Sequence, residues 1–196
     1  MNVITHYDLL IDEDNDPFRD PPALQKYMWQ WDGDPFLEAL KLAKDKKVLE
    51  IGIGTGRIAA KVAPYCLSLT GIDVSSKTIE RAKENLKEYN NISFVCDDFN
   101  IYKFSETFDV IYSSLTMMHF KNKEQVISKI AKLLNDDGLF CLSIDKNQNQ
   151  YIDMGNRKIK VYPDTPDNIV SLVNATNMTV SRVLEIENAY IIVCNK

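Results

Sequence analysis

Histidine, cysteine and glycine are scarce in this sequence, and it contains no long apolar run. Its 196 residues include 2 histidines, 4 cysteines and 7 glycines. The cysteines stand at positions 66, 96, 141 and 194, too far apart for a paired metal-ligand motif, so we expect no metal site. No apolar stretch approaches the roughly 18 residues of a membrane-spanning helix, and no basic region with an apolar run follows Met1. We therefore expect neither a membrane partner nor a signal peptide.

Positive charge is not in excess either. Asp and Glu number 28 against 23 Lys and Arg, for a net charge of −5. The whole imbalance lies in the first 20 residues, where Arg19 stands alone against six acids: Asp8, Asp12, Glu13, Asp14, Asp16 and Asp20. A neutral body does not attract a phosphate backbone in general, so nucleic acid is disfavoured as a partner. The acidic segment itself is typical of a solvated stretch of chain.

The pattern that is present from residue 47 onward alternates short β-branched runs with amphipathic segments. It predicts strands at residues 47–51, 67–73, 92–96, 108–113 and 139–144, and helices at residues 57–63, 124–134 and 167–174, with another capped by Ser75 or Ser76. This alternation predicts right-handed βαβ units and an α/β, Rossmann-like, mostly parallel sheet with helices on both faces. Residues 180–187 and 189–194 are too close together for a crossover, so they predict a C-terminal antiparallel hairpin.

Two further patterns concern the residues that precede the sheet and the cysteines within it. Residues 21–31 predict a helix whose aromatic stripe, Tyr27 and Trp31, is typical of core packing, and Asp34 is predicted to cap the next helix. Cys96, Cys141 and Cys194 lie in apolar strand-like stretches and are predicted to be buried reduced thiols. Reduced thiols favour a cytoplasmic protein.

The glycines concentrate where a polar ligand is expected. Gly52 and Gly54 follow the first strand and precede a helix, so backbone amides can approach an anionic or polar group there. Asp73 ends the second strand 21 residues after Gly52, where a carboxylate can accept both hydroxyls of a ribose. The dinucleotide fingerprint read from Gly52 fails at Arg57, although a looser form read from Gly54 fits late in the loop. The ligand is therefore predicted to be a nucleoside that carries a further polar group.

Several motifs then match a known family in order. Val48-Leu49-Glu50-Ile51-Gly52-Ile53-Gly54-Thr55-Gly56 resembles the first motif of class I S-adenosylmethionine-dependent methyltransferases, and residues 71–75, 94–99, 108–115 and 133–139 resemble their later strand motifs. The resemblance covers residues 47–196. It implies a seven-stranded sheet, S-adenosylmethionine as cofactor with S-adenosylhomocysteine as product, and a methyltransferase domain over residues 47–196. Residues 1–46 would then form a helical N-terminal cap within one compact domain.

The resemblance also implies a role for each matching residue. It implies that Gly52, Ile53 and Gly54 pack against the methionine portion and that Glu50 orients the loop or the cofactor ammonium. Asp73 would take the ribose diol. The remaining implied contacts are Val74 and Phe99 on the adenine faces, Asp97 or Asp98 on its exocyclic amine, and the Ser113 carbonyl on the ammonium.

His119, just beyond the fourth strand, is the best candidate for a catalytic base, with packing of that loop as its structural alternative. Tyr7, Asp8, Trp29 and Trp31 could reach over the cleft, because residues 145–162 provide little to form a lid. A small-molecule acceptor is expected, since the sequence offers no appended domain to hold a macromolecule; its identity and the oligomeric state stay open. Two other functions remain: an NAD(P)-dependent oxidoreductase, and a non-catalytic nucleoside-binding regulatory module of the same fold.

Overall fold

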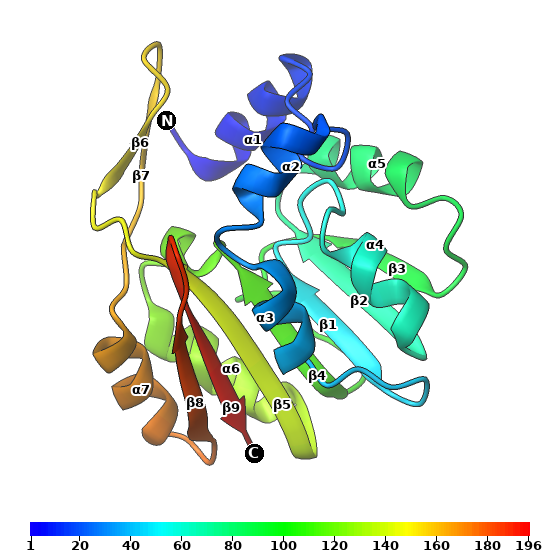
Figure 1. Ribbon diagram of the computed structural model, residues 1–196, viewed down its shortest axis with the longest axis vertical. Helices are drawn as coiled ribbons and strands as arrows, with labels where there is room; N and C mark the ends of the chain where they lie inside the picture. The colour runs from blue at the N-terminus through cyan, green and yellow to red at the C-terminus, as the bar shows by residue number, and fades with distance from the viewer.

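The central sheet has the strand order β3-β2-β1-β4-β5-β9-β8 in the computed structural model, which describes residues 1–196. Its strands are β1 (Lys47–Ile51), β2 (Ser68–Asp73), β3 (Ile92–Cys96), β4 (Phe108–Ser114), β5 (Leu134–Asp145), β8 (Thr179–Glu185) and β9 (Ala189–Asn195). The strands β1 to β5 pair in parallel, whereas β9 pairs antiparallel with both β5 and β8 (Figure 1). The predicted seven-stranded, mostly parallel sheet with a C-terminal hairpin is therefore confirmed.

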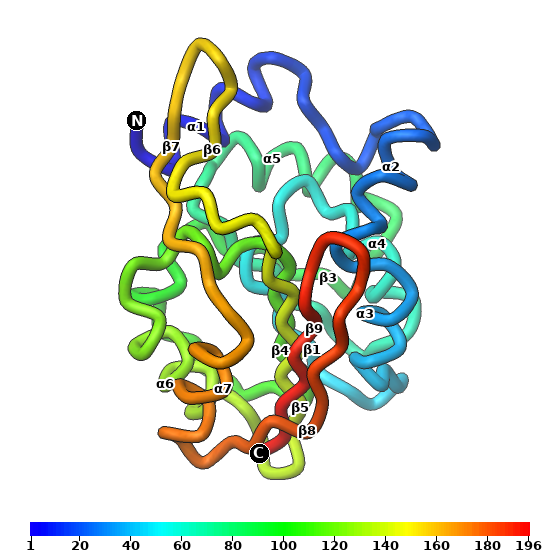
Figure 2. Tube along the Cα trace, turned by 60° about the vertical axis from the view of Figure 1, so that its left-hand side comes forward, coloured from blue at the N-terminus to red at the C-terminus, as the bar shows by residue number.

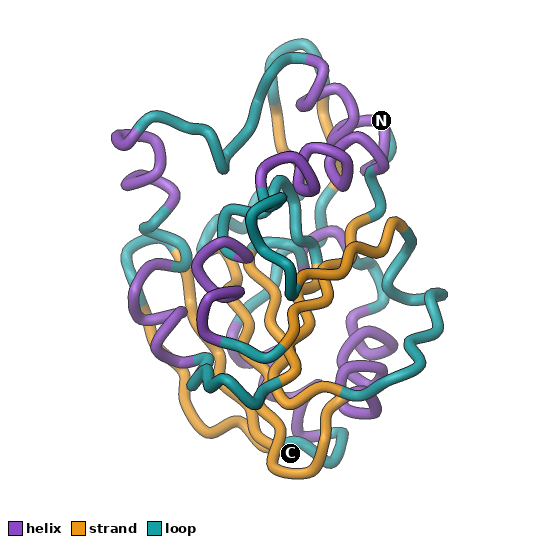
Figure 3. The backbone as a smooth tube through the Cα atoms, turned by 90° about the vertical axis from the view of Figure 1, so that its right-hand side faces the viewer, coloured by secondary structure: helices purple, strands orange, loops and turns teal.

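Helices cover both faces of this sheet, as predicted (Figure 3). They are α1 (Val3–Asp12), α2 (Pro22–Met28), α3 (Gly33–Ala39), α4 (Ala59–Val62), α5 (Ser76–Asn85), α6 (Lys123–Leu133) and α7 (Pro166–Asn174), with 3₁₀ turns at Ala63–Tyr65 and Met117–His119. Successive strand residues point to opposite faces, so Val48 joins one apolar core with α3, α4 and α5 while Leu49 joins the other with α6 and α7. The buried, β-branched strands thus form the layer between two helical layers.

The predicted helix starts are right in one case and wrong in another. Ser75 caps α5, because its side chain accepts a hydrogen bond from the Thr78 amide. The predicted Asp34 cap is wrong: Asp32 occupies that position at α3, and its carboxylate accepts from the Gly33 amide. The aromatic stripe was also misassigned, because α2 buries no residue and Tyr27 is 53% exposed.

The cysteine prediction holds for two thiols and fails for the third. Cys141 and Cys194 are buried in the middle strands β5 and β9. Cys96 is exposed, because it ends β3 at the edge of the sheet, where one side has no neighbouring strand. An apolar run in the sequence does not distinguish a central strand from an edge strand.

The acidic N-terminal segment was predicted to be solvated, and this is right only in part: Asp12, Glu13 and Asp14 are exposed, but the segment is also bound to the body of the protein. Asp12 pairs with Lys77 at 2.6 Å and Asp16 with Arg81 at 3.1 Å, both on α5. Asp16 is only 4% exposed. The charges that were expected to face solvent therefore hold the segment containing α1 against α5.

A small hairpin, β6 (Tyr151–Asp153) with β7 (Lys158–Lys160), follows β5. Figure 2 shows this hairpin beside α1. Arg157 links the two segments, because its two terminal guanidinium nitrogens donate to the Glu13 carboxylate at 2.5 and 2.6 Å. None of the helices has the length and apolarity that would let it cross a membrane.

Candidate active site

A cavity of about 1070 Å³ opens at the carboxyl ends of the parallel strands, at the end of the sheet where α1 and α2 lie (Figure 1). The chain leaves β1 toward β2 on one side, and β4 lies on the other, so the cavity sits where the strand order reverses. Residues that follow four strands line it together with α1: Gly52, Ile53 and Gly54 after β1, Asp73 and Val74 at β2, Asp97, Asp98 and Phe99 after β3, and Ser114, Leu115 and Thr116 at β4.

The glycine loop has the geometry of a backbone-lined ligand site. Gly52 has φ +80° and Gly54 has φ +55°, backbone conformations that residues other than glycine rarely adopt. A methyl group on Gly52 would meet the Thr116 side chain at 2.1 Å, whereas one on Gly54 would meet no atom within 4 Å. Thr116 thus packs against the loop at Gly52. At Gly54 the backbone is open to the cavity, so a ligand can approach it.

Asp73 joins the end of β2 to this loop. Its Oδ2 accepts from the Gly54 amide at 3.1 Å, and its Oδ1 accepts from the Ser75 amide at 3.0 Å. Burial raises the pKa of the Asp73 carboxyl above its usual value, an effect that the backbone amides oppose. Each carboxylate oxygen has a further lone pair for a ligand hydroxyl, so the geometry fits a vicinal diol.

The residues after β3 form the end of the cavity that is farthest from β4 in the strand order. Asp97 accepts from the Asp98 amide at 2.7 Å, and Asp98 from the Asn100 amide at 2.8 Å, so each carboxylate uses one oxygen to form the turn. The Phe99 ring is 2% exposed and lies 6.4 Å from the Phe120 ring, centroid to centroid. Val74 lines the cavity as well. This end therefore combines apolar surfaces with free carboxylate oxygens, which suits a flat heterocycle with an amine.

Glu50 and Ser113 lie at the floor and differ in their access to the cavity. Glu50 is 3% exposed and accepts a hydrogen bond from the Tyr112 hydroxyl at 2.8 Å, and burial raises the pKa of its carboxyl to about 8. Ser113 is fully buried, donates to the Ile51 carbonyl, and does not line the cavity. The next residues do: Ser114 and Leu115, the latter held at φ +54°.

The sequence analysis missed two further residues at the floor of the cavity, Arg57 and Asp32. Arg57 lines the cavity, and its two terminal nitrogens contact the two oxygens of Asp32, which is 1% exposed. The Ser114 hydroxyl donates to the same Asp32 carboxylate at 2.8 Å. Arg57 entered the sequence interpretation only as a mismatch to a dinucleotide motif, and nothing in the sequence pairs it with a residue 25 positions earlier.

His119 and Tyr7 contact one another in the wall of the cavity. The Tyr7 hydroxyl lies 2.8 Å from His119 Nε2, and both side chains line the cavity. Burial lowers the pKa of His119 to about 4, so its imidazole is neutral at pH 7. Burial raises the pKa of the Tyr7 phenol above its usual value. His119 Nδ1 is buried and has no hydrogen-bond partner.

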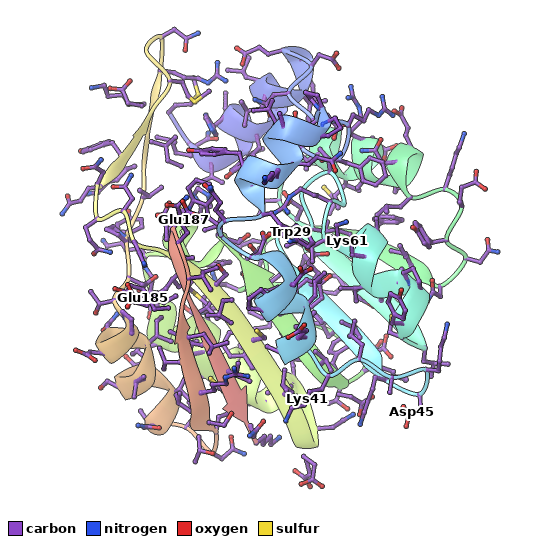
Figure 4. The ribbon with its side chains drawn as sticks, in the orientation of Figure 1. Trp29, Lys41, Asp45, Lys61, Glu185 and Glu187 are labelled. Carbon is purple, nitrogen blue, oxygen red and sulfur yellow. The ribbon has the colours of Figure 1, made fainter.

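The other leader residues expected over the cleft lie elsewhere. Asp8 accepts from the Ser75 hydroxyl at 2.7 Å and so fixes α1 to the start of α5. The Trp29 ring lies 4.8 Å from the Lys61 ammonium, and Trp31 packs edge-on against Tyr27. Figure 4 labels Trp29 and Lys61, which lie near one another. Neither tryptophan lines the cavity.

A second cavity of about 420 Å³ lies between the end of β5 and the β6-β7 hairpin. Leu115 lines both cavities and so forms part of the wall between them. The lining of this second cavity includes Met117, Met118, Tyr151 and three acids, Asp145, Asp153 and Asp164.

The sheet order and the larger cavity, at the ends of β1 to β4, define the class of protein: a Rossmann-like α/β protein with a candidate ligand site at its topological switch point. Residues 48–138 match the family described as "Methyltransferase domain". These residues, just under half of the chain, are similar to that family.

Two curated relatives and two solved structures are similar to this chain. The chain is 29% identical over 120 residues to the Ubiquinone biosynthesis O-methyltransferase of Coxiella burnetii (strain RSA 493 / Nine Mile phase I), covering 60% of this chain and 51% of the relative. It is 29% identical over 115 residues to the Nodulation protein S of Rhizobium tropici, covering 54% and 48%. The chain thus spans about half the length of the curated relatives it matches.

Among solved structures, the N-methyltransferase NodS from Bradyrhizobium japonicum WM9 in complex with S-adenosyl-l-homocysteine superposes with a TM-score of 0.76 at 18% identity, covering 100% of this chain and 99% of the other. Magnesium protoporphyrin IX methyltransferase from Synechocystis PCC 6803 with bound SAM gives 0.76 at 15% identity, covering 99% and 95%. At these identities the likeness establishes the fold.

Proposed function

We propose that this protein transfers a methyl group from S-adenosylmethionine to a small-molecule acceptor. The observation that carries the proposal is the gathering of four strand-end motifs around one cavity, with open space above the Gly54 backbone. The names of the relatives, which are O- and N-methyltransferases, support the same reaction class. Because the chain spans only half of those curated relatives, its acceptor need not be theirs.

The residues present fit an adenosyl amino acid along the length of the cavity. Asp73 would hold the ribose diol, and Val74 and Phe99 would flank the adenine. Asp97 or Asp98 would accept from the adenine amine. Gly52, Ile53 and Gly54 would pack along the methionine portion, with Glu50 and the Ser113 carbonyl directed at its ammonium; Ser114, which lines the cavity where Ser113 does not, is an added candidate. When bound, the cofactor supplies a methyl group on a positively charged sulfur.

An acceptor hydroxyl or ammonium must lose a proton when its oxygen or nitrogen is methylated, and His119 is the group proposed to receive that proton. Its pKa of about 4 keeps the imidazole unprotonated at neutral pH, so it is available as a base. The low pKa also makes it a weak base, which favours acceptors of some acidity, such as phenols, over aliphatic alcohols. Tyr7, 2.8 Å from Nε2, orients the imidazole and closes the cavity to water.

The acceptor is proposed to be small because α1 covers the cavity and the second cavity beside it is only about 420 Å³. Leu115, which lines both, would then separate the cofactor from a neighbouring acceptor space. Nucleic acid is not a proposed partner, and a cytoplasmic setting remains part of this proposal.

The test is titration calorimetry with S-adenosylmethionine, S-adenosylhomocysteine and NADH, followed by transfer of labelled methyl to a panel of phenols and amines. We expect saturable binding of the first two, no heat from NADH, and label on at least one acceptor. Asp73→Ala is expected to remove binding. Asp45→Ala is the matched control, since Asp45 is an exposed acid in the loop before β1 (Figure 4). Binding of NADH alone would favour the oxidoreductase, and binding without any transfer would favour the non-catalytic module.

A further inference from the structure

One end of the proposed cofactor still lacks a partner. The roles above provide for the ribose, the adenine and the ammonium, but the methionine portion also carries an α-carboxylate. A carboxylate that enters a partly buried cavity needs N–H donors or a cation, because its desolvation is costly when it is left unpaired.

Two basic side chains, Lys121 and Arg57, line the cavity, and their positions differ. Lys121 is exposed and follows Phe120, whose ring lies 6.4 Å from Phe99 at the adenine end. Arg57 begins the segment after the glycine loop, and its side chain is 14% exposed. It shares its carboxylate partner, Asp32, with Ser114 at the end of β4. Arg57 is therefore the cation at the glycine-loop end, where the methionine portion is proposed to lie.

The guanidinium of Arg57 has donors to spare. It carries five N–H groups in a planar fork. Its only hydrogen bonds in the structure are to Asp32, one from each terminal nitrogen. Three N–H groups thus remain for a second carboxylate. Glu50, the other buried acid at this end of the cavity, accepts from the Tyr112 hydroxyl instead.

Asp32 fixes where that fork points. Its carboxylate caps α3 through the Gly33 amide at 3.1 Å and accepts from the Ser114 hydroxyl at 2.8 Å. The preceding residue is fixed as well, because the Ser143 hydroxyl donates to the Trp31 carbonyl at 2.5 Å. Asp32 is thus tied to the ends of β4 and β5, so the guanidinium bonded to it loses little freedom when a ligand binds.

We propose that Arg57, positioned by Asp32, binds the α-carboxylate of the cofactor, so that this site requires an intact amino-acid end on its adenosyl ligand. The inference rests on the proposed function, since it presumes an adenosyl amino acid in the cavity. It makes Arg57 a ligand-binding residue and Asp32 a positioning residue.

The experiment compares two ligands that differ only at the carboxylate: S-adenosylhomocysteine and its decarboxylated analogue, which keeps adenosine, thioether and amine. Charge-assisted hydrogen bonds of this kind correspond to roughly a tenfold to hundredfold change in affinity, so the wild-type protein is expected to prefer the intact ligand by about that factor. In Arg57→Gln this preference is expected to disappear, through weaker binding of the intact ligand and less than about threefold change for the analogue. Lys61→Gln, a cation of α4 outside the cavity, is the matched control and should keep the preference.

A general loss of structure would weaken both ligands together, so the ratio separates binding from folding. If Arg57→Gln does not fold with Asp32 left buried, Arg57→Lys tests the same point: it keeps the charge, loses the fork, and should retain a reduced preference. A wild-type preference near one, or equal losses for both ligands in the Arg57 variant, would overturn this inference alone. Loss of the preference in Lys121→Gln instead would also overturn it. A wild-type protein that binds neither ligand would overturn the proposed function with it.

Discussion

The Tyr7 hydroxyl lies 2.8 Å from Nε2 of His119, although 112 positions separate the two residues in the chain. This contact makes α1 a wall of the cavity rather than an appendage. Asp8 on the same helix accepts from the Ser75 hydroxyl at the start of α5, and Asp16 beyond it pairs with Arg81. These three contacts therefore hold the N-terminal segment against α5 and against the loops that form the site.

Replacing His119 tests its role as a base. We expect His119→Ala to lower kcat by about a hundredfold or more, within the range for general-base catalysis, with little change in cofactor affinity. Because burial lowers the pKa of His119 to about 4 in the ligand-free protein, the acid limb of the wild-type kcat/KM profile is expected near pH 4, well below the ordinary histidine value. Tyr7→Phe is expected either to move this acid limb to a higher pH or to lower kcat by a smaller factor than His119→Ala does. Unchanged turnover in His119→Ala would retire the base.

Alanine substitutions in the glycine loop should separate folding from binding. Gly52→Ala is expected to destabilise the protein by more than about 2 kcal/mol, because its methyl group would meet Thr116 at 2.1 Å and the backbone is at φ +80°. Gly54→Ala has room for its methyl group, so it should cost only the backbone strain, about 1 kcal/mol, yet its methyl group would occupy space needed by the ligand.

Chemical denaturation and calorimetry measure the two effects. Gly155→Ala, at φ +80° in the β6-β7 hairpin with open space around it, is the control for strain without a ligand site. We expect it to match Gly54→Ala in stability and to match the wild type in binding. Equal ligand affinity in the Gly54 and Gly155 variants would argue against contact between the ligand and the loop.

The contact between the acidic segment and α5 should contribute measurably to stability. Arg81→Ala leaves the 4%-exposed Asp16 carboxylate with Arg19, at 3.4 Å, as its remaining cation and is expected to cost about 1–3 kcal/mol of unfolding free energy. Lys83→Ala on the same helix removes a pair with Glu80, which is 69% exposed, and should cost less than about 0.5 kcal/mol. Urea denaturation distinguishes them, and equal small costs would mean that the segment is held by apolar contacts instead.

Glu50 should make stability depend on pH in a direction opposite to that of most acids. Burial raises the pKa of its carboxyl from 4.5 to about 8, so between these values the native state keeps a proton that the unfolded state releases. The stabilisation is fully present below pH 4.5 and is lost as the pH rises through 8. Glu50→Gln should therefore gain stability relative to the wild type between pH 5 and pH 8, by at most about 5 kcal/mol. Parallel stability curves for the two proteins would contradict this.

Patterns within single elements predicted most of the sheet. The strands β1 to β4 begin and end within a residue or two of their predicted bounds, because a β-branched run between turn residues has few alternatives. The Ser75 cap was also predictable, since its bond to the Thr78 amide spans three residues. The Asp34 prediction failed because two nearby aspartates satisfy the same local rule, and packing of Asp32 against Arg57 and Ser114 decided between them.

The same reasoning placed Tyr7 over the cleft, where it lines the cavity, but it predicted neither the helix α1 nor the residues that hold it there. Its acids are read correctly as polar, but their partners on α5 lie 65 to 69 positions away, and a local pattern carries no information on such pairings. Cys96 was misassigned for a related reason: its exposure depends on β3 being an edge strand, which is a property of the sheet order.

The sequence by itself therefore determined the alternation of strands and helices, the glycine loop and the acid at the end of β2, because these depend on periodicity and on spacing along the chain. Only the tertiary structure decided that Tyr7 meets His119, that Asp32 holds Arg57 at the cavity floor, and that Ser114 rather than Ser113 reaches the cavity. These relationships arise where parallel strands bring distant residues to one edge of the sheet. The physical reason is that desolvation and charge pairing act between neighbours in space, which a linear pattern does not specify.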